Sequence, residues 1–163
     1  MIQRARLLEP GEDLNAEILE VLNRDPVVNC FLYSRLKPLF KNPLDFRKSI
    51  KNLIGGDLWL YEKDGQLDAI CYAGANLVPT AANAAAIESF AQRAKRAGRY
   101  SSSIVGPQES VLDLWERLVG LWGPARAVRE RQPLLAIDHR PTVLTDVSSI
   151  LSHDGALGGR CKP

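Results

Sequence analysis

The sequence predicts a mixed α/β domain in which helices cover both faces of one sheet. Apolar residues recur with a helical period in some segments and with a period of two in others, and these segments alternate along the chain. Glycine and proline separate most of them. Helices that connect strands favour a mixed sheet between two helical layers, and 163 residues suffice for one such domain.

A strand and a helix are expected first. Residues 2–8 alternate loosely and end at a Glu-Pro-Gly turn, which is typical of a short strand. Leu14, Ile18 and Leu22 then recur at helical spacing behind an acidic pair, and acidic residues favour a helix N-terminus.

Two further helices are predicted before the chain reaches a Gly-Gly pair. Asp25 is a capping residue followed by proline, so a helix is expected to begin there, and Pro38 and Pro43 are expected to mark its end. Residues 45–54 predict a third, partly basic helix that stops at the two glycines.

The apolar period then changes to two, which predicts a β-hairpin. Residues 58–62 and 67–75 are the two expected strands. Asp64 and Gly65 lie between them, and both residue types tolerate the positive φ that a tight hairpin turn requires.

The following segments are predicted as helix, strand, helix and closing strand. A helix begins after Asn83 and ends at Gly98, and residues 101–105 form a short strand. The next predicted helix has an apolar stripe and ends at the Gly-Pro pair at 123–124. This stripe consists of Val111, Trp115, Leu118, Val119 and Trp122. Residues 125–138 are expected to form one or two closing strands, with Pro133 at a bulge or an edge.

The order of elements is therefore strand, helices, hairpin, helix, strand, helix, strand. This domain is predicted to span residues 1–140. Residues 141–163 combine serines and glycines with scattered apolar residues, and ordering them would cost backbone entropy that few buried contacts could offset. They are expected to form a disordered tail.

Charge and composition argue against several classes of protein. The formal net charge of +2 gives no strong field for nucleic acid or for an anionic membrane, so neither partner is expected. No run approaches the roughly 18 apolar residues of a membrane span, and the basic N-terminus is not followed by the apolar segment of a signal peptide. The protein is expected in the cytoplasm. Cys30 and Cys71 lie in apolar runs and are expected to be buried free thiols.

The chain does not contain a complete set of catalytic side chains. A nucleophilic triad needs a histidine base, and the histidines, His139 and His153, fall at the end of the last predicted strand and in the tail. No carboxylate pair or cysteine–histidine cluster has the spacing of a metal site, so no metal is expected.

One connection has the character of an anion site. Residues 74–83 link a predicted strand to a predicted helix, and a helix N-terminus presents free N–H groups and the positive end of a dipole. The alternative is an ordinary turn in which Asn83 caps the helix. Both interpretations stay open on these residues alone.

Several segments, taken together and in order, resemble a known family. They are Asp-Pro-Val-Val-Asn-Cys-Phe-Leu (25–32), Gly-Asp-Leu-Trp (56–59), Gly-Ala-Asn-Leu-Val-Pro (74–79), Ser-Ile-Val-Gly-Pro (103–107), Trp-Gly-Pro-Ala-Arg (122–126) and Arg-Gln-Pro-Leu (131–134). Over residues 2–140 the chain resembles the domain of unknown function that precedes an acetyltransferase domain of the GNAT superfamily in actinobacterial proteins.

This resemblance implies a GNAT-like mixed sheet and a site for acetyl-CoA. In active GNAT domains the loop that enters the central helix reads Gln/Arg-x-x-Gly-x-Gly/Ala, and its N–H groups bind the pyrophosphate. The corresponding residues here, Val-Pro-Thr-Ala-Ala-Asn at 78–83, contain no glycine, glutamine or arginine, and the proline removes a donor. The cofactor-binding residues that the resemblance implies are Val78, Thr80, Ala81, Ala82 and Asn83.

Two functions follow as hypotheses. The first is a domain related to GNAT N-acetyltransferases, which transfer an acyl group from acyl-CoA to an amine; here catalysis is expected of a second domain that this chain lacks. Tyr72 would be the aromatic hydroxyl nearest such chemistry. The second is a non-catalytic interaction or regulatory module, with a catalytic GNAT domain or a second copy as its partner. Exposed Trp115 or Trp122 would favour it, because large exposed aromatic residues often mark interfaces.

Overall fold

The structure is a computed structural model that describes residues 4–9, 12–41, 50–129 and 131–135. Within these residues, five strands form one sheet in the order in which they occur along the chain. Neighbours among the first four strands are antiparallel and the last two strands are parallel, so the sheet is mixed. The strands are β1 (Arg6–Leu7), β2 (Asp57–Lys63), β3 (Gln66–Ala73), β4 (Asn76–Pro79) and β5 (Ser103–Ile104).

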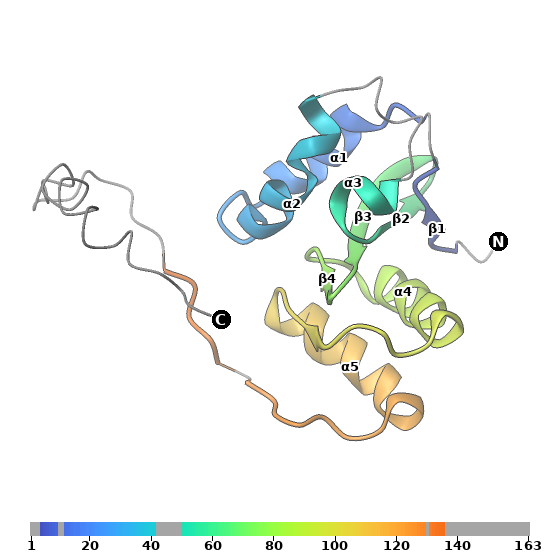
Figure 1. The fold of residues 1–163 in the computed structure, drawn as a ribbon, viewed down its shortest axis with the longest axis vertical. Coiled ribbons are helices and arrows are strands. Elements are labelled where there is room, and N and C mark those ends of the chain that lie inside the picture. The colour runs from blue at the N-terminus through green and yellow to red at the C-terminus, as the bar shows by residue number, and fades with distance from the viewer. Residues whose placement is uncertain (1–3, 10–11, 42–49, 130, 136–163) are drawn as a thin grey trace, which may run out of the picture.

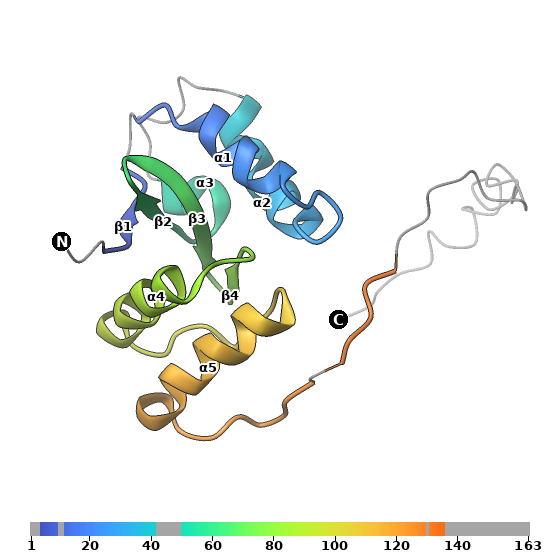
Figure 2. The ribbon, with the colours of Figure 1, turned by 180° about the vertical axis from the view of Figure 1, so that it is seen from behind.

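Helices cover both faces of this sheet (Figures 1 and 2). One layer consists of α1 (Asn15–Asn23), α2 (Cys30–Lys41) and α3 (Ile50–Ile54). The other layer consists of α4 (Ala84–Ala97) and α5 (Gln108–Trp122). The predicted α/β class, with helices on both faces of a mixed sheet, is confirmed.

The pleat of the central strands divides the apolar core into two parts. On β2, Leu58 and Leu60 pack with α1, α2 and α3, whereas the alternate residues Trp59 and Tyr61 pack with α4 and α5. Successive side chains of a strand point to opposite faces, so a strand covered on both sides is apolar at every central position. This explains the unbroken apolar run in the middle of β2.

The hairpin turn between β2 and β3 forms as its sequence predicts. Asp64 has φ +53° and Gly65 has φ +78°. Both residues occupy the left-handed region that a two-residue turn needs in order to match the twist of the strands. The turn sets the register in which Lys63 faces Gln66.

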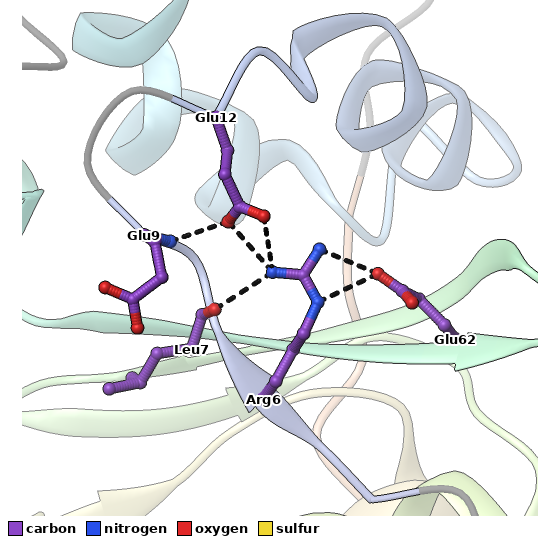
Figure 3. Close-up of polar contacts among 5 residues, drawn as sticks. All are labelled: Arg6, Leu7, Glu9, Glu12 and Glu62. Atoms are coloured by element: carbon purple, nitrogen blue, oxygen red, sulfur yellow. Dashed lines mark hydrogen bonds and ion pairs between the residues drawn. The ribbon is translucent and has the colours of Figure 1, made fainter.

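Arg6 ties the two-residue edge strand β1 to its surroundings (Figure 3). Its Nε and Nη2 donate to Glu62 on β2 at 2.9 and 2.7 Å, and its Nη1 donates to both carboxylate oxygens of Glu12 at 2.9 and 2.8 Å. Burial alone would raise the pKa of Glu12, but the Glu9 N–H and the Arg6 guanidinium lower this pKa below its usual value. The cluster therefore joins β1, β2 and the segment that leads into α1.

The second helix differs from its prediction at both ends. Asp25 closes only a single turn, in which its Oδ1 accepts the Val28 N–H at 3.0 Å, and α2 begins at Cys30. The helix also includes Pro38, the first of the two prolines expected at its end, and extends to Lys41. Leu36 and Leu39, on either side of the proline, have no exposed surface, and their burial offsets the hydrogen bond that a proline removes.

The closing strand predicted for residues 125–138 is wrong over its described part. Residues 125–129 and 131–135 are not in a strand, and Leu134 and Leu135 are 55% and 86% exposed. Alternation alone does not hold a strand, because the backbone also needs a neighbour to pair with. A different strand was missed. β4 lies within the stretch interpreted as a loop, four residues long and two residues after β3.

One prediction about burial is also corrected. Cys30 is exposed, whereas Cys71 is fully buried and its pKa is raised by that burial. On α5 the buried residues are Ser110, Leu114 and Leu118, while Trp115 is only partly buried and Val119 is 38% exposed. Of the five residues in the predicted apolar stripe, only Leu118 is buried.

Some predictions fall on residues outside the described parts. These are the beginning of the first predicted strand at residues 2 and 3, residues 45–49 of the third helix, residues 136–138 of the closing strand, both histidines, and the tail at 141–163. None of the helices in the described parts combines the length and the apolar character needed to cross a bilayer.

Candidate functional site

The predicted cofactor-binding residues lie where β4 ends and α4 begins. Val78 belongs to β4 and is buried in the core, and Thr80 directly after the strand is only 2% exposed. Ala81 and Asn83 are exposed, and Ala82 is half-buried. The five residues are thus contiguous in space, but two of them belong to the core rather than to an open loop.

Thr80 uses its backbone and its side chain to join the end of β4 to β3. Its N–H donates to the Ile70 carbonyl at 3.0 Å, and its hydroxyl donates to the same carbonyl at 3.0 Å. The hydroxyl oxygen also accepts the Ile70 N–H at 3.1 Å. The Thr80 amide is therefore committed to the sheet and does not face a ligand.

The N–H groups of Ala82 and Ala86 also donate hydrogen bonds within the protein. The Ala82 N–H donates to the Oγ of Ser110 on α5 at 3.2 Å, and the Ala86 N–H donates to Oδ1 of Asn83 at 2.9 Å. Asn83 is extended, with φ −72° and ψ 165°, as expected of a residue that caps a helix N-terminus. The ordinary-turn interpretation of residues 74–83 is confirmed in this respect.

A carboxylate of the protein lies beside the N-terminus of α4. The Asn83 Nδ2 donates to Oδ2 of Asp68 at 2.7 Å, so the capping residue also binds an acidic residue of β3. Arg24, from the turn after α1, is 3.7 Å from the other Asp68 oxygen and donates to the Asp68 carbonyl at 2.5 Å. Negative charge stabilises the positive end of a helix dipole, and here Asp68 provides it.

The parallel strands β4 and β5, and the segments that follow them, lie side by side as far as the turn before α4. Leu77 pairs with Ile104, and the Val105 N–H donates to the Leu77 carbonyl at 3.0 Å. A Cβ on Gly106 would lie 2.8 Å from the Pro79 carbonyl oxygen. The segments that follow β4 and β5 therefore stay close together beyond the last paired residues. The Ser110–Ala82 hydrogen bond then links the two segments that follow the strands.

A small groove lies between this turn and the α1–α2 connection. Its volume is about 190 Å³, below the roughly 300 Å³ at which small-molecule sites begin. Eight residues line it: Val21, Arg24, Asp25, Val28, Asn29, Thr80, Ala81 and Pro107.

Tyr72 has a structural role. It is 2% exposed, and its hydroxyl lies 3.2 Å from the Ile54 carbonyl oxygen and 3.0 Å from that of Gly55. The hydroxyl thus binds the end of α3, as expected for a tyrosine at the edge of a core. Among the described residues, no group of three His, Cys, Asp or Glu side chains could hold a metal ion.

Sequence reasoning missed a larger pocket between α2 and α3. Its volume is about 420 Å³, and Arg35 of α2 is its charged residue. The pocket is lined by Phe31, Ser34, Arg35, Pro38, Leu53, Ile54 and Gly55. Only the spacing of Phe31 and Arg35, one helical turn apart, was visible in the sequence; the contribution of α3 depends on tertiary packing.

Comparisons with known proteins give one match. Neither the curated proteins nor the solved structures contain a significant match to this chain. A family model matches residues 56–153, a segment that begins just before β2, includes the candidate turn and α5, and covers more than half of the chain. The chain therefore belongs to the family described as Domain of unknown function (DUF4081).

Proposed function

We propose that this domain is related to GNAT acetyltransferases, that it does not bind acetyl-CoA, and that it serves as a non-catalytic interaction module for a catalytic GNAT domain. The resemblance of the ordered motifs supports the relationship. The proposal also places the protein in the cytoplasm, a reducing compartment, which suits the free thiols of Cys30 and Cys71.

One observation carries the proposal: Asp68 stands where a pyrophosphate would have to bind. Its carboxylate is held by the capping residue Asn83 at 2.7 Å. A diphosphate at the same helix end would meet this negative charge at close range, and like charges a few ångströms apart repel. The amides of Thr80 and Ala82, which could otherwise bind phosphate oxygens, already have partners in the protein.

The contact between β4 and β5 points in the same direction. In GNAT proteins the pantetheine arm enters between two splayed strands. Here Gly106 touches the Pro79 carbonyl and Ser110 binds the Ala82 amide. An arm inserted at this place would have to break the Ser110 hydrogen bond and separate the two segments.

The interaction role is supported by the outer face of α5. Val119 is 38% exposed, and Trp115, one helical turn before it on the same face of α5, is half-buried. Large apolar side chains grouped on one surface are typical of docking sites. The proposed contact surface of α5 consists of Trp115 and Val119.

Calorimetric titration of the purified chain with acetyl-CoA tests the first part of the proposal. We expect no heat of binding up to millimolar ligand. A dissociation constant in the micromolar range, lost on Asn83→Pro but kept on Val128→Ser, would refute it. For the second part, Val119→Ser should weaken association with a catalytic GNAT domain in sedimentation experiments, whereas Val128→Ser, which changes an exposed residue elsewhere, should not.

A further inference from the structure

We infer that the pocket between α2 and α3 binds a small organic carboxylate whose body is apolar, with Arg35 as the anchor for the carboxylate. This inference is independent of the acetyl-CoA question, because the pocket shares no residue with the turn at the start of α4. Its volume of about 420 Å³ lies within the roughly 300–1,000 Å³ of small-molecule sites.

Arg35 is a positive charge without a carboxylate partner in the described part of the chain. The ion pairs there involve Arg6, Arg24 and Arg117. The contacts of Arg35 are instead with two aromatic rings, since its Cζ is 5.8 Å from the centroid of Phe31 and 5.8 Å from that of Tyr72. The charge is thus oriented by cation–π attraction but is not neutralised.

The ring of Tyr72 gives the guanidinium a fixed support. The Tyr72 hydroxyl is bound to the carbonyls at the end of α3, and the ring packs against glycines: a Cβ on Gly56 would lie 2.9 Å from its Cε2. Arg35 is exposed, and its contact with this buried ring restricts the side chain, which lowers the entropy lost when its planar fork binds a ligand.

The other residues that line the pocket indicate that the rest of the ligand is apolar. Phe31 is 40% exposed, and Pro38 and Leu53 are half-buried, so they offer apolar surface next to the charge. The Ser34 hydroxyl adds one hydrogen-bonding group. An arginine fork binds a carboxylate through two parallel N–H···O bonds, and the apolar walls select a carboxylate with an acyl or aryl group over a bare anion.

Ligand-observed NMR on the full chain tests the inference with benzoate and hexanoate as probes. For ligands this small we expect dissociation constants on the order of 1 mM. Benzyl alcohol, which has the ring but no charge, should bind at least about tenfold more weakly, because it loses the charge-assisted pair. Inorganic phosphate should also bind at least about tenfold more weakly, because it lacks the apolar part.

Variants locate the binding. Arg35→Gln should weaken benzoate binding at least about tenfold, and Ser34→Phe should abolish it by filling the pocket while leaving Arg35 in place. Lys37→Gln removes the same charge from the same helix outside the pocket and should bind benzoate as the wild type does. Amide spectra of each variant check that the fold is kept.

Three results would overturn the inference: no saturation by either carboxylate at about 20 mM, equal affinity of Arg35→Gln and the wild type, or phosphate binding as tight as benzoate. The last result would indicate a bare anion site.

Discussion

Thr80 shows how a single buried hydroxyl can hold two strands together. It accepts the Ile70 N–H and donates to the Ile70 carbonyl, so Thr80→Val would leave a buried N–H without a partner. We expect a loss of about 1–3 kcal/mol in the free energy of unfolding, measured by urea denaturation. Thr80→Ser keeps the hydroxyl and should retain most of the stability. If Thr80→Ser were destabilised while Thr80→Val kept its stability, the methyl group rather than the hydroxyl would be responsible.

Glu12 predicts a pH dependence of stability. Its pKa in the folded protein lies below the reference value of 4.5, so the folded state favours the charged form. The contribution is complete above the unfolded-state pKa and is lost as the pH falls through the lower, folded-state value. Both Arg6 and Glu12 are about one-third exposed, which limits the effect to roughly 0.2–1 kcal/mol after solvent screening.

Glu12→Gln provides the measurement for this effect. The difference in melting temperature between the wild type and Glu12→Gln should be largest near neutral pH and should vanish in acid, below the folded-state pKa. A difference that is constant from neutral to acid pH would show that the charge of Glu12 does not contribute.

At the scale of elements, the N-terminus of α4 depends on a pair of side chains. Asn83→Asp keeps the cap but replaces the Nδ2 donor to Asp68 with a second carboxylate, so we expect a loss of about 1 kcal/mol from repulsion. Adding Asp68→Asn restores a donor–acceptor pair and should recover part of this loss. A double-mutant cycle by chemical denaturation measures the coupling, and additive effects would show that the two side chains do not interact.

The elements that sequence reasoning located are those with local signals. Three such signals were predicted because they depend on neighbouring residues: the Asp64-Gly65 turn, the Asn83 cap and the cap at Gly98. Gly98 has φ +80°, and its N–H donates to the Ala94 carbonyl. β4 was not, because a four-residue strand that ends in proline has no periodicity of its own. The helical continuation through Pro38 depends on burial against distant residues, which a local pattern does not contain.

For the candidate sites too, local features were predicted from the sequence and contacts between distant segments were not. The turn at 78–83 was located from the sequence because it precedes a helix, yet the role of Asp68 there depends on a hydrogen bond across the sheet edge. The Arg35 pocket was not foreseen, because Leu53 lines it from α3 and Tyr72 of β3 contacts Arg35. Pairing between distant segments, rather than residue type, separates what was predicted from what was not.

At the scale of the whole molecule, one sheet serves two helical layers, and this predicts a single cooperative unfolding transition. The three tryptophans report on only one layer: Trp59 and Trp122 pack with the α4–α5 core, and Trp115 lies on α5. Leu36 lies in the other layer, on α2, and has no exposed surface. Leu36→Ala should cost about 2–5 kcal/mol and lower the melting temperature by roughly 10 °C.

Tryptophan fluorescence should detect this shift although no tryptophan lies near Leu36. Leu58 and Trp59 are adjacent on β2 and point to opposite layers, so neither layer keeps its support when the other melts. Far-UV circular dichroism, which reports on all helices, should give the same midpoint, as two-state unfolding requires. Leu121→Ala, at a residue 63% exposed, should shift neither signal appreciably. Fluorescence that melts at the wild-type temperature in Leu36→Ala, while circular dichroism shows an earlier transition, would mean that the two layers unfold independently.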